Sequence, residues 1–412
     1  MSLNKFIGSI LIVIGTTIGG GILALPLVCA PLGWFFATIV LIVIWMLMTV
    51  TGLLVLEVNL SLAPSACSFS SMAGETIGRL GKIVVWLSCL LLLYALTSAY
   101  IAGASSLLKE VLQFYFRVNV PGPISAILFV LILGSAVFWS TKATDYLNRG
   151  LISIKGFLLF VTILFLAPNV DFASMAVKVG SGDSKYLFAV LPILMTAFGY
   201  HTVVPSIRVY FGDKPQELRR IIIWATSIAL VIYLVWVFIV LNIIPLVGAN
   251  SFEQIATEGT SVGGLAATIA AFVSNKWVIY GFNGFSNVAM TTSFLGVTLG
   301  LFDFVADGFK RPDTRFGRLQ TAGLTFIPPL IFGIYYPRGF ILALSYAALF
   351  VTILEVILPA IMAYKLRYSK RVVSQPYRVF GGKWLLFTVA ACGITLIIIQ
   401  ILLKVGMLPG VD

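Results

Sequence analysis

The chain has 412 residues, of which 60% are hydrophobic and only 10% are charged, and its mean hydropathy is +1.06. A soluble domain of this size could not bury so much apolar surface, so the composition excludes a soluble protein and indicates a polytopic membrane protein. The net charge of +12 does not indicate a nucleic-acid partner, because the basic residues gather on one side of the predicted membrane.

Eleven apolar segments are long enough to cross the hydrocarbon core of a bilayer, which requires about 20 helical residues. In chain order the predicted spans are residues 6–30, 33–60, 83–112, 122–139, 150–168, 187–207, 219–244, 277–305, 319–336, 339–364 and 384–405. Residues 251–275 are expected to form an external loop with a short interfacial helix. We therefore predict an all-α polytopic membrane protein with 11 transmembrane helices, in which residues 1–412 form a single domain.

The distribution of basic residues predicts how the chain is oriented in the membrane. With the N-terminus inside, 19 of the 27 Lys and Arg residues fall on the inner side, and seven fall on the outer side. An excess of Lys and Arg in short cytoplasmic loops is the usual pattern of multi-pass proteins. The sequence therefore predicts a cytoplasmic N-terminus and, because the number of spans is odd, an external C-terminus.

Two of the predicted spans are interrupted by glycine at the same distance from a proline. In the first span Gly20 lies six residues before Pro26, and in the sixth span Gly199 lies six residues before Pro205. Broken helices at corresponding positions of two halves are the best sequence pointer to the binding site of a transporter. Lipid cannot satisfy the backbone groups that such a break frees, whereas a bound solute or ion can.

The spans divide around these breaks into two halves of five and one extra helix. The first repeat would comprise residues 6–168, the second repeat residues 187–365, and the eleventh helix residues 384–405. Because five is odd, the second half would run through the membrane in the opposite sense to the first. The sequence therefore predicts a 5+5 inverted repeat with one appended helix.

The first break is predicted to bind the carboxylate of a small solute. Glycines let the backbone approach a ligand closely, and the N-terminus of the half-helix that follows is partly positive, which suits an anion. The alternative interpretation is close packing of helices through small residues. The predicted substrate-binding residues of this break are Thr16, Thr17, Gly19, Gly20 and Gly21.

The second break, at residues 198–201, is predicted to bind an ammonium group through the carbonyl groups that end its first half-helix. The predicted substrate-binding residues here are Phe198, Gly199, Tyr200 and His201. His201 is the only histidine in the chain, and both a proton relay and a structural hydrogen bond stay open for it. Tyr94, in the third span, is predicted to add an aromatic wall.

Lys155 lies in the fifth predicted span, six positions beyond Arg149 and about 9 Å along a helix from the inner surface. It either snorkels to that surface or points inward, where it would take the place of a bound cation and exchange a proton. The predicted proton-coupling residues are Lys155, Thr291, Thr292 and Ser293. Each hydroxyl could instead bond to its own helix. Glu57 and Glu355 are costly within spans unless they are paired, and their roles stay open.

Several stretches of the chain resemble one known family. Four of them are GTTIGGGILALP at residues 15–26, YALTSAYIAGA at 94–104, FGYHTVVPSI at 198–207 and TTSFLGVTLGLFDFVADGF at 291–309. They are similar to the bacterial hydroxy and aromatic amino acid permeases of the amino acid-polyamine-organocation superfamily, above all to the tyrosine-specific members. The resemblance runs nearly end to end. It implies a leucine-transporter-type inverted-repeat fold and proton symport of an aromatic amino acid, most of all tyrosine, across the bacterial inner membrane.

The resemblance also implies a role for Lys155, because related transporters use a lysine of the fifth span in place of a sodium ion. Tryptophan, serine or threonine as the substrate and sodium as the coupling ion are the alternatives. An intramembrane enzyme using His201 with Glu57 or Asp303 is remote, because no Ser–His, Cys–His or HExxH arrangement accompanies that histidine. The cysteines are scattered and predict no metal site, so we expect no cofactor. The expected partners are an amino acid, a proton and the lipid bilayer, without nucleic acid or an obligate protein partner.

Overall fold

The computed structural model describes residues 3–62, 68–170, 183–259, 261–273, 276–312, 314–368 and 377–410, and over these it contains helices and no β-strand. The long helices are α3 (Gly33–Ser61), α5 (Arg79–Phe116), α6 (Gly122–Trp139), α7 (Thr141–Leu166), α11 (Pro215–Ile243), α14 (Lys276–Gly308), α15 (Arg315–Tyr335) and α18 (Gly382–Lys404). Shorter helices are α4 (Phe69–Thr76), α12 (Phe252–Thr257) and α13 (Val262–Phe272). The predicted all-α class is confirmed.

Three further spans are composite. The first consists of α1 (Leu3–Thr17), the 3₁₀ turn η1 (Gly20–Leu23) and α2 (Ala24–Cys29). The second consists of α9 (Leu187–Ala197), the 3₁₀ turn η5 (His201–Val203) and α10 (Val204–Phe211), and the third of α16 (Phe340–Val351), the π-helical turn η6 (Thr352–Ile357) and α17 (Leu358–Tyr368). Short 3₁₀ turns, η3 (Ala167–Asn169) and η4 (Ser184–Tyr186), flank the connection between α7 and α9.

The described residues contain nine helical segments that are long and apolar enough to cross a membrane, and the bent pair at the N-terminus adds a tenth. The predicted span at residues 319–336 corresponds to α15, a helix of 21 residues that is not among these ten. Its first turn carries Arg315 and Arg318, and Pro328 and Pro329 lie in its interior. The count of eleven therefore stays a prediction, whereas a multi-pass helical protein is established.

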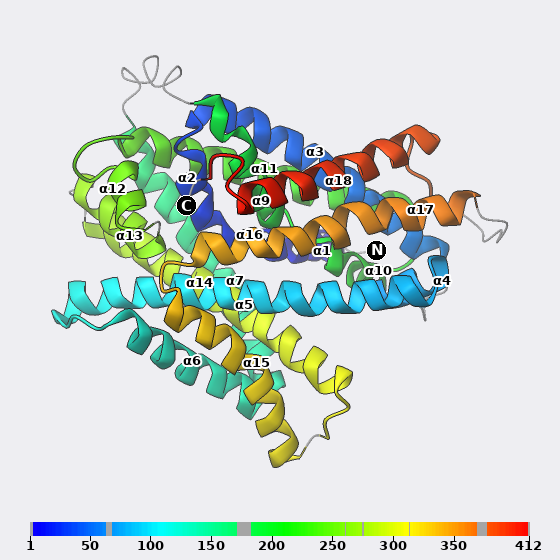
Figure 1. Ribbon diagram of the computed structural model, residues 1–412, viewed down its shortest axis with the longest axis horizontal. Helices are drawn as coiled ribbons and strands as arrows, with labels where there is room; N and C mark the ends of the chain where they lie inside the picture. The colour runs from blue at the N-terminus through cyan, green and yellow to red at the C-terminus, as the bar shows by residue number, and fades with distance from the viewer. Residues whose placement is uncertain are drawn as a thin grey trace.

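The two interrupted segments lie inside a frame of long helices (Figure 1). In Figure 1, α5 runs the length of the molecule, with α6 and α15 on one side of it and α16 and α17 on the other. The frame is closed by contacts of α14 with α5 and α7, of α16 with α5 and α9, and of α11 with α1 and α3. The frame therefore holds both breaks in the interior, where lipid does not reach them.

Part of the sequence prediction falls on residues that the structure does not describe. These are one cysteine, Cys67, and three of the basic residues used for the orientation, Lys178, Lys370 and Arg371. The predicted external loop at residues 251–275 is described in large part. It contains α12 and α13, and α13 is tied to α5 by a hydrogen bond from the Gly263 N–H to Ser106 Oγ at 3.1 Å.

Candidate functional site

The first break separates α1 from η1, whose first residue is Gly20. The Gly20 N–H donates to Oγ of Ser293, on α14, at 2.7 Å. A side-chain hydroxyl therefore satisfies a backbone group that has lost its helical partner. A Cβ atom on Gly20 would lie 2.9 Å from Sδ of Met290 and 3.0 Å from the ring of Tyr100. Glycine is required at this position because α14 and α5 approach the backbone so closely.

The carbonyl groups freed at the first break bond to two buried side chains. Lys155, on α7, is 4% exposed, and its ammonium donates to the carbonyl of Ile18 at 2.6 Å and to that of Gly15 at 3.5 Å. The hydroxyl of Tyr233, on α11, donates to the carbonyl of Thr17 at 2.7 Å. Lys155 thus points inward, at the negative end of the α1 dipole. An ammonium group has three donors and no acceptor, and these two carbonyl groups satisfy part of that donor capacity.

The second break separates α9 from η5 and is connected to the first by one phenol. The Tyr233 hydroxyl lies 2.8 Å from the carbonyl of Ala197, the last residue of α9, as well as near Thr17. Its single proton is therefore shared between the carbonyl ends of both half-helices. At this break a Cβ atom on Gly199 would lie 3.5 Å from the carboxylate oxygens of Glu355. The two breaks and Glu355 consequently belong to one continuous region.

The large side chains of the second break pack against frame helices and do not line the cavity. Phe198 packs edge-on against Tyr233, with ring centroids 5.0 Å apart. The hydroxyl of Tyr200 donates to the carbonyl of Met48, on α3, at 3.2 Å. A Cβ atom at Gly52 would lie 1.9 Å from that hydroxyl oxygen, so α3 needs a glycine there. These contacts anchor the second break on the frame.

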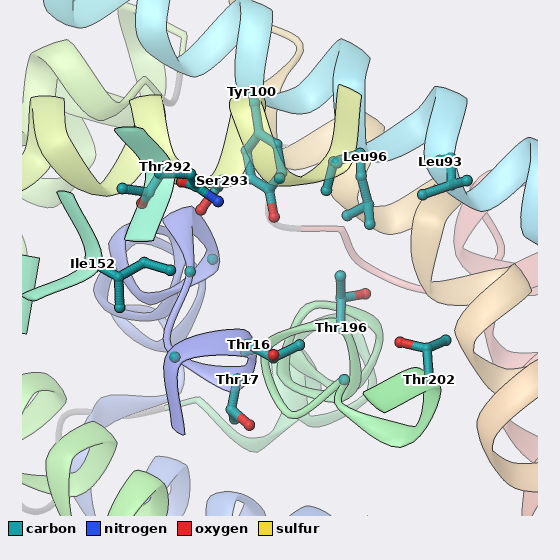
Figure 2. Close-up of a pocket in the computed structure, with 18 of the residues that line it drawn as sticks. Thr16, Thr17, Leu93, Leu96, Tyr100, Ile152, Thr196, Thr202, Thr292 and Ser293 are labelled. Carbon is teal, nitrogen blue, oxygen red and sulfur yellow. The ribbon is translucent and has the colours of Figure 1, made fainter. Parts of the chain in front are cut away.

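A cavity of about 570 Å³ lies between the two breaks (Figure 2). Eight of the residues predicted from the sequence line it, namely Thr16, Thr17, Gly19, Gly21, Lys155, Gly199, Thr292 and Ser293. Figure 2 shows the hydroxyl of Tyr100 pointing from α5 into the space that separates it from Thr16 and Thr196. The structure therefore brings together the first break, one glycine of the second break, the lysine and two hydroxyl groups of α14.

The cavity wall also contains residues outside the predicted set of site residues; one of them, Tyr100, is an aromatic residue of the third span that the sequence offers as plausible lining beside Tyr94. The further polar members of the wall are Tyr100, Asn148, Arg149, Thr196, Thr202 and Glu355, and its apolar members include Leu93, Leu96, Ile152, Leu344 and Val351. Residues 93, 96 and 100 have helical spacing and share one face of α5, so this spacing was a signal that could have identified them as cavity-lining residues. Thr196 and Thr202 flank the second break in the sequence, so their position beside the break was a signal that could have identified them.

Six predicted site residues do not line the cavity: Gly20, Tyr94, Phe198, Tyr200, His201 and Thr291. Tyr94 instead donates its hydroxyl to the carbonyl of Leu324, on α15, at 2.8 Å. Thr291 lies one residue before the cavity-lining Thr292, and one residue along a helix rotates the side chain by about 100°. The rotation of each helix therefore decides which of these neighbouring residues reach the cavity. Their closeness in the sequence does not decide it.

Glu57 has a structural partner outside the cavity. Both carboxylate oxygens accept hydrogen bonds from Arg367, on α17, at 2.6 and 2.5 Å, and the backbone N–H of Val379 adds a third at 2.7 Å. Such a bidentate pair satisfies a buried carboxylate. Removal of either partner would leave an uncompensated charge, so this pair serves the fold at the end of α3.

The two ends of the cavity region differ. Toward one end the cavity reaches Ile12 on α1 and Arg149 on α7, near the side that the sequence predicts to be cytoplasmic. Toward the other, Trp236 stacks on Phe282 with ring centroids 5.8 Å apart, and its Nε1–H donates to the carbonyl of Ile22 at 2.9 Å. Both rings are at most 1% exposed. The structure is therefore open toward Arg149 and packed with aromatic rings on the opposite side.

Several known proteins are similar to this chain. The sequence profile of the tryptophan/tyrosine permease family matches residues 2–400. Among curated proteins, a tryptophan-specific transport protein of Pseudomonas aeruginosa is 35% identical, over 98% of this chain and 96% of its own. The tyrosine-specific transport system 1 of Haemophilus influenzae is 34% identical, over 99% of this chain and 100% of its own.

Among solved structures, a manganese transporter of Eremococcus coleocola superposes with a TM-score of 0.63. The match covers 97% of this chain and 85% of the transporter, at 12% sequence identity. At that identity the likeness concerns the fold alone. It shows that the helical arrangement described above is one that a transporter uses.

Proposed function

Because the chain belongs to the tryptophan/tyrosine permease family, we propose that it imports an aromatic amino acid, tyrosine above all, by proton symport. The family and these relatives are transport proteins and not enzymes. The observation that carries the coupling part of the proposal is the contact of Lys155 with the carbonyl of Ile18. A titratable ammonium there can join or leave the first break as it gains or loses a proton.

The cavity suggests how the substrate lies. Its carboxylate would approach the positive N-terminal end of η1, beside Gly21 and Ser293, and its ammonium the carbonyl groups that end α9. The aromatic ring would fill the apolar part of the cavity between Leu96 and Ile152. The hydroxyl groups of the wall would then select among rings that differ in their own polar atoms.

Proton coupling follows from charge balance at the first break. While Lys155 is protonated it neutralises the carbonyl end of α1 and keeps α1 against α7. After it releases the proton to the inner side it no longer holds these carbonyl groups, and the break is free to move. Lys155 would carry one proton per cycle with the amino acid, and no sodium site is required.

The proposal includes the predicted orientation and repeat. We place the protein in the bacterial inner membrane with its N-terminus in the cytoplasm and its C-terminus outside, with residues 6–168 and 187–365 as inverted repeats. The charge distribution and the paired breaks support this arrangement. Reporter fusions at the two ends should report opposite sides, and reporters on the same side would contradict the inverted repeat.

Tryptophan is the second candidate substrate. A tryptophan-specific relative and a tyrosine-specific relative match this chain at nearly the same identity, 35% and 34%. Uptake of labelled tyrosine into proteoliposomes, in competition with each of the twenty amino acids, separates the two. We expect unlabelled tyrosine to compete best. Stronger competition by tryptophan would favour the second candidate, and no competition by any aromatic amino acid would overturn the proposal.

A further inference from the structure

A buried titratable pair lies at the second break, apart from Lys155. Nδ1 of His201 lies 2.7 Å from Oε2 of Glu355, and the two side chains are 0% and 4% exposed. Neither atom completes a hydrogen bond of ordinary angles with a described residue. Of the two side chains only that of Glu355 lines the cavity. The pair therefore connects a buried imidazole to the cavity through one carboxyl group.

A helical irregularity determines where this carboxyl group lies. Glu355 belongs to η6, the π-helical turn between α16 and α17. A π-turn shifts the register of the residues it carries and is frequent at functional sites. Residue 352 of the same turn is held from α18, because Nε2 of Gln400 donates to Oγ1 of Thr352 at 3.0 Å. The carboxyl group of Glu355 therefore lies on a turn that is fixed against α18.

Thr51, on α3, lets the pair hold one proton more or one fewer. Its Oγ1 lies 2.8 Å from Nε2 of His201 and 3.1 Å from the carbonyl oxygen of Met48. In the first state the Thr51 hydroxyl donates to Met48, so Nε2 carries a proton and donates it to Thr51. A second proton must then lie between Nδ1 and Oε2, which are too close to meet without one, and the pair holds two protons. In the second state the hydroxyl donates to Nε2, the single proton is on Nδ1 and faces the carboxylate, and the pair holds one proton.

Lys155 and Arg149 line the same cavity as Glu355, but among the described contacts neither forms an ion pair with it. Tyr200, next to His201, and Cys89, on α5, are titratable groups near Glu355. The elements α3 and α18 present Thr51 and Gln400, which are neutral. Within the described ranges, His201 is the one basic side chain at ion-pair distance from Glu355. An intramembrane carboxylate with so few charged partners is a candidate functional group.

We propose that His201 and Glu355, with Thr51 as a hydroxyl switch, form a second proton-binding site. The pair holds the extra proton while the cavity is closed to water, and Glu355 passes it to water when the cavity is open toward Arg149. This inference rests on the proposed function, in which proton movement accompanies the amino acid. It adds a proton carrier at the second break to the lysine at the first.

The chain permits a direct test because His201 is its only histidine. Full-length protein with nitrogen-15-labelled histidine, purified with a tag that lacks histidine, gives imidazole signals from one residue. We expect these signals to show one step of changed protonation or tautomer as the pH is varied. Glu355→Gln should move that step to lower pH by about one unit or more, a tenfold loss of proton affinity. Glu110→Gln, a half-buried glutamate of α5 away from the pair, should leave it unchanged.

The Thr51 variants test the hydroxyl switch. Thr51→Val should remove the change of tautomer, and Thr51→Ser should retain it, because serine keeps the hydroxyl. Signals that do not respond to pH in the wild type, or that titrate identically in Glu355→Gln, would overturn the proposal. These measurements require no transport. Absence of uptake by a protein with the expected titration would therefore overturn the proposed function and leave the proton site standing.

Discussion

At the first break, the freed backbone groups bond to side chains from distant helices, whereas at the second the side chains of the break itself bond to the frame. Lys155, Ser293 and Tyr233 reach the first break from α7, α14 and α11. At the second, Tyr200 and His201 reach out to α3. A ligand can therefore replace the side chains that bond to the backbone of the first break, without breaking any contact made by the break's own side chains. The second is held in place and presents mainly Gly199 and neighbouring hydroxyl groups to the cavity.

Replacing Lys155 should have the largest effect, because it removes the only basic partner that the described residues offer to the carbonyl end of α1. Lys155→Ala should abolish uphill uptake under an imposed pH gradient while substrate exchange continues. Lys155→Arg should also fail, because arginine remains protonated. Accumulation of substrate by the alanine variant under a proton gradient would show that the lysine does not couple transport.

A side chain at Gly20 should separate the first break from α5 and α14. Gly20→Leu places atoms where Met290 and Tyr100 already lie, so the backbone must move and Ser293 loses its donor. We expect substrate affinity to fall about 100-fold, roughly 2.7 kcal/mol, measured by scintillation proximity binding. The matched control is Gly300→Leu, on the exposed part of α14 where a Cβ atom meets nothing within 4 Å. Equal affinities in both variants would argue that this break does not contact the ligand.

A side chain at Gly52 tests whether the second break is anchored on α3. Gly52→Ala would place a Cβ atom 1.9 Å from the Tyr200 hydroxyl oxygen, and overpacking of this kind costs about 1–3 kcal/mol. Thermal unfolding in detergent should show the loss, and Tyr200→Phe should recover part of it by removing the nearest atom. Gly156→Ala, at an open and exposed position of α7, serves as the control. An unchanged melting temperature in Gly52→Ala would contradict the anchoring.

The smallest expected effect concerns the phenol that joins the breaks. Tyr233→Phe removes the donor shared by the carbonyl groups of Thr17 and Ala197. Hydrogen bonds within membrane proteins contribute about 0.6 kcal/mol on average and up to about 1.7 kcal/mol, so we expect a loss in that range. Tyr335→Phe, on the exposed end of α15, provides the comparison. A variant as stable as this control, with unchanged transport, would show that the two breaks are not coupled through Tyr233.

Composition and local pattern were sufficient for the fold class and for the position of both breaks. Apolar length predicts the spans, and glycine followed by proline marks where a membrane helix is interrupted. The number of spans was harder to predict from the sequence, because α15 combines arginines at its start with two internal prolines. Hydropathy alone does not settle whether such a helix crosses the bilayer.

The sequence could not decide where the side chains point. Lys155 was compatible with snorkelling or with an inward position, and the choice depends on the rotation of α7 about its own axis. The approach of His201 to Glu355 joins residues far apart in the chain, and the register of a π-turn places one of them. Tyr233 carries no motif, because a single tyrosine in an apolar helix looks the same whether it faces lipid or two broken helices.

We propose that an amino acid bound between the breaks enters together with a proton. The direct measurement is internal acidification, followed by a trapped pH indicator, recorded with uptake of labelled tyrosine in proteoliposomes whose membrane potential is clamped. Addition of tyrosine to wild-type protein should acidify the interior in proportion to uptake, and Lys155→Ala should abolish this acidification. Tyrosine uptake by the wild type without any acidification would show that tyrosine does not enter together with a proton.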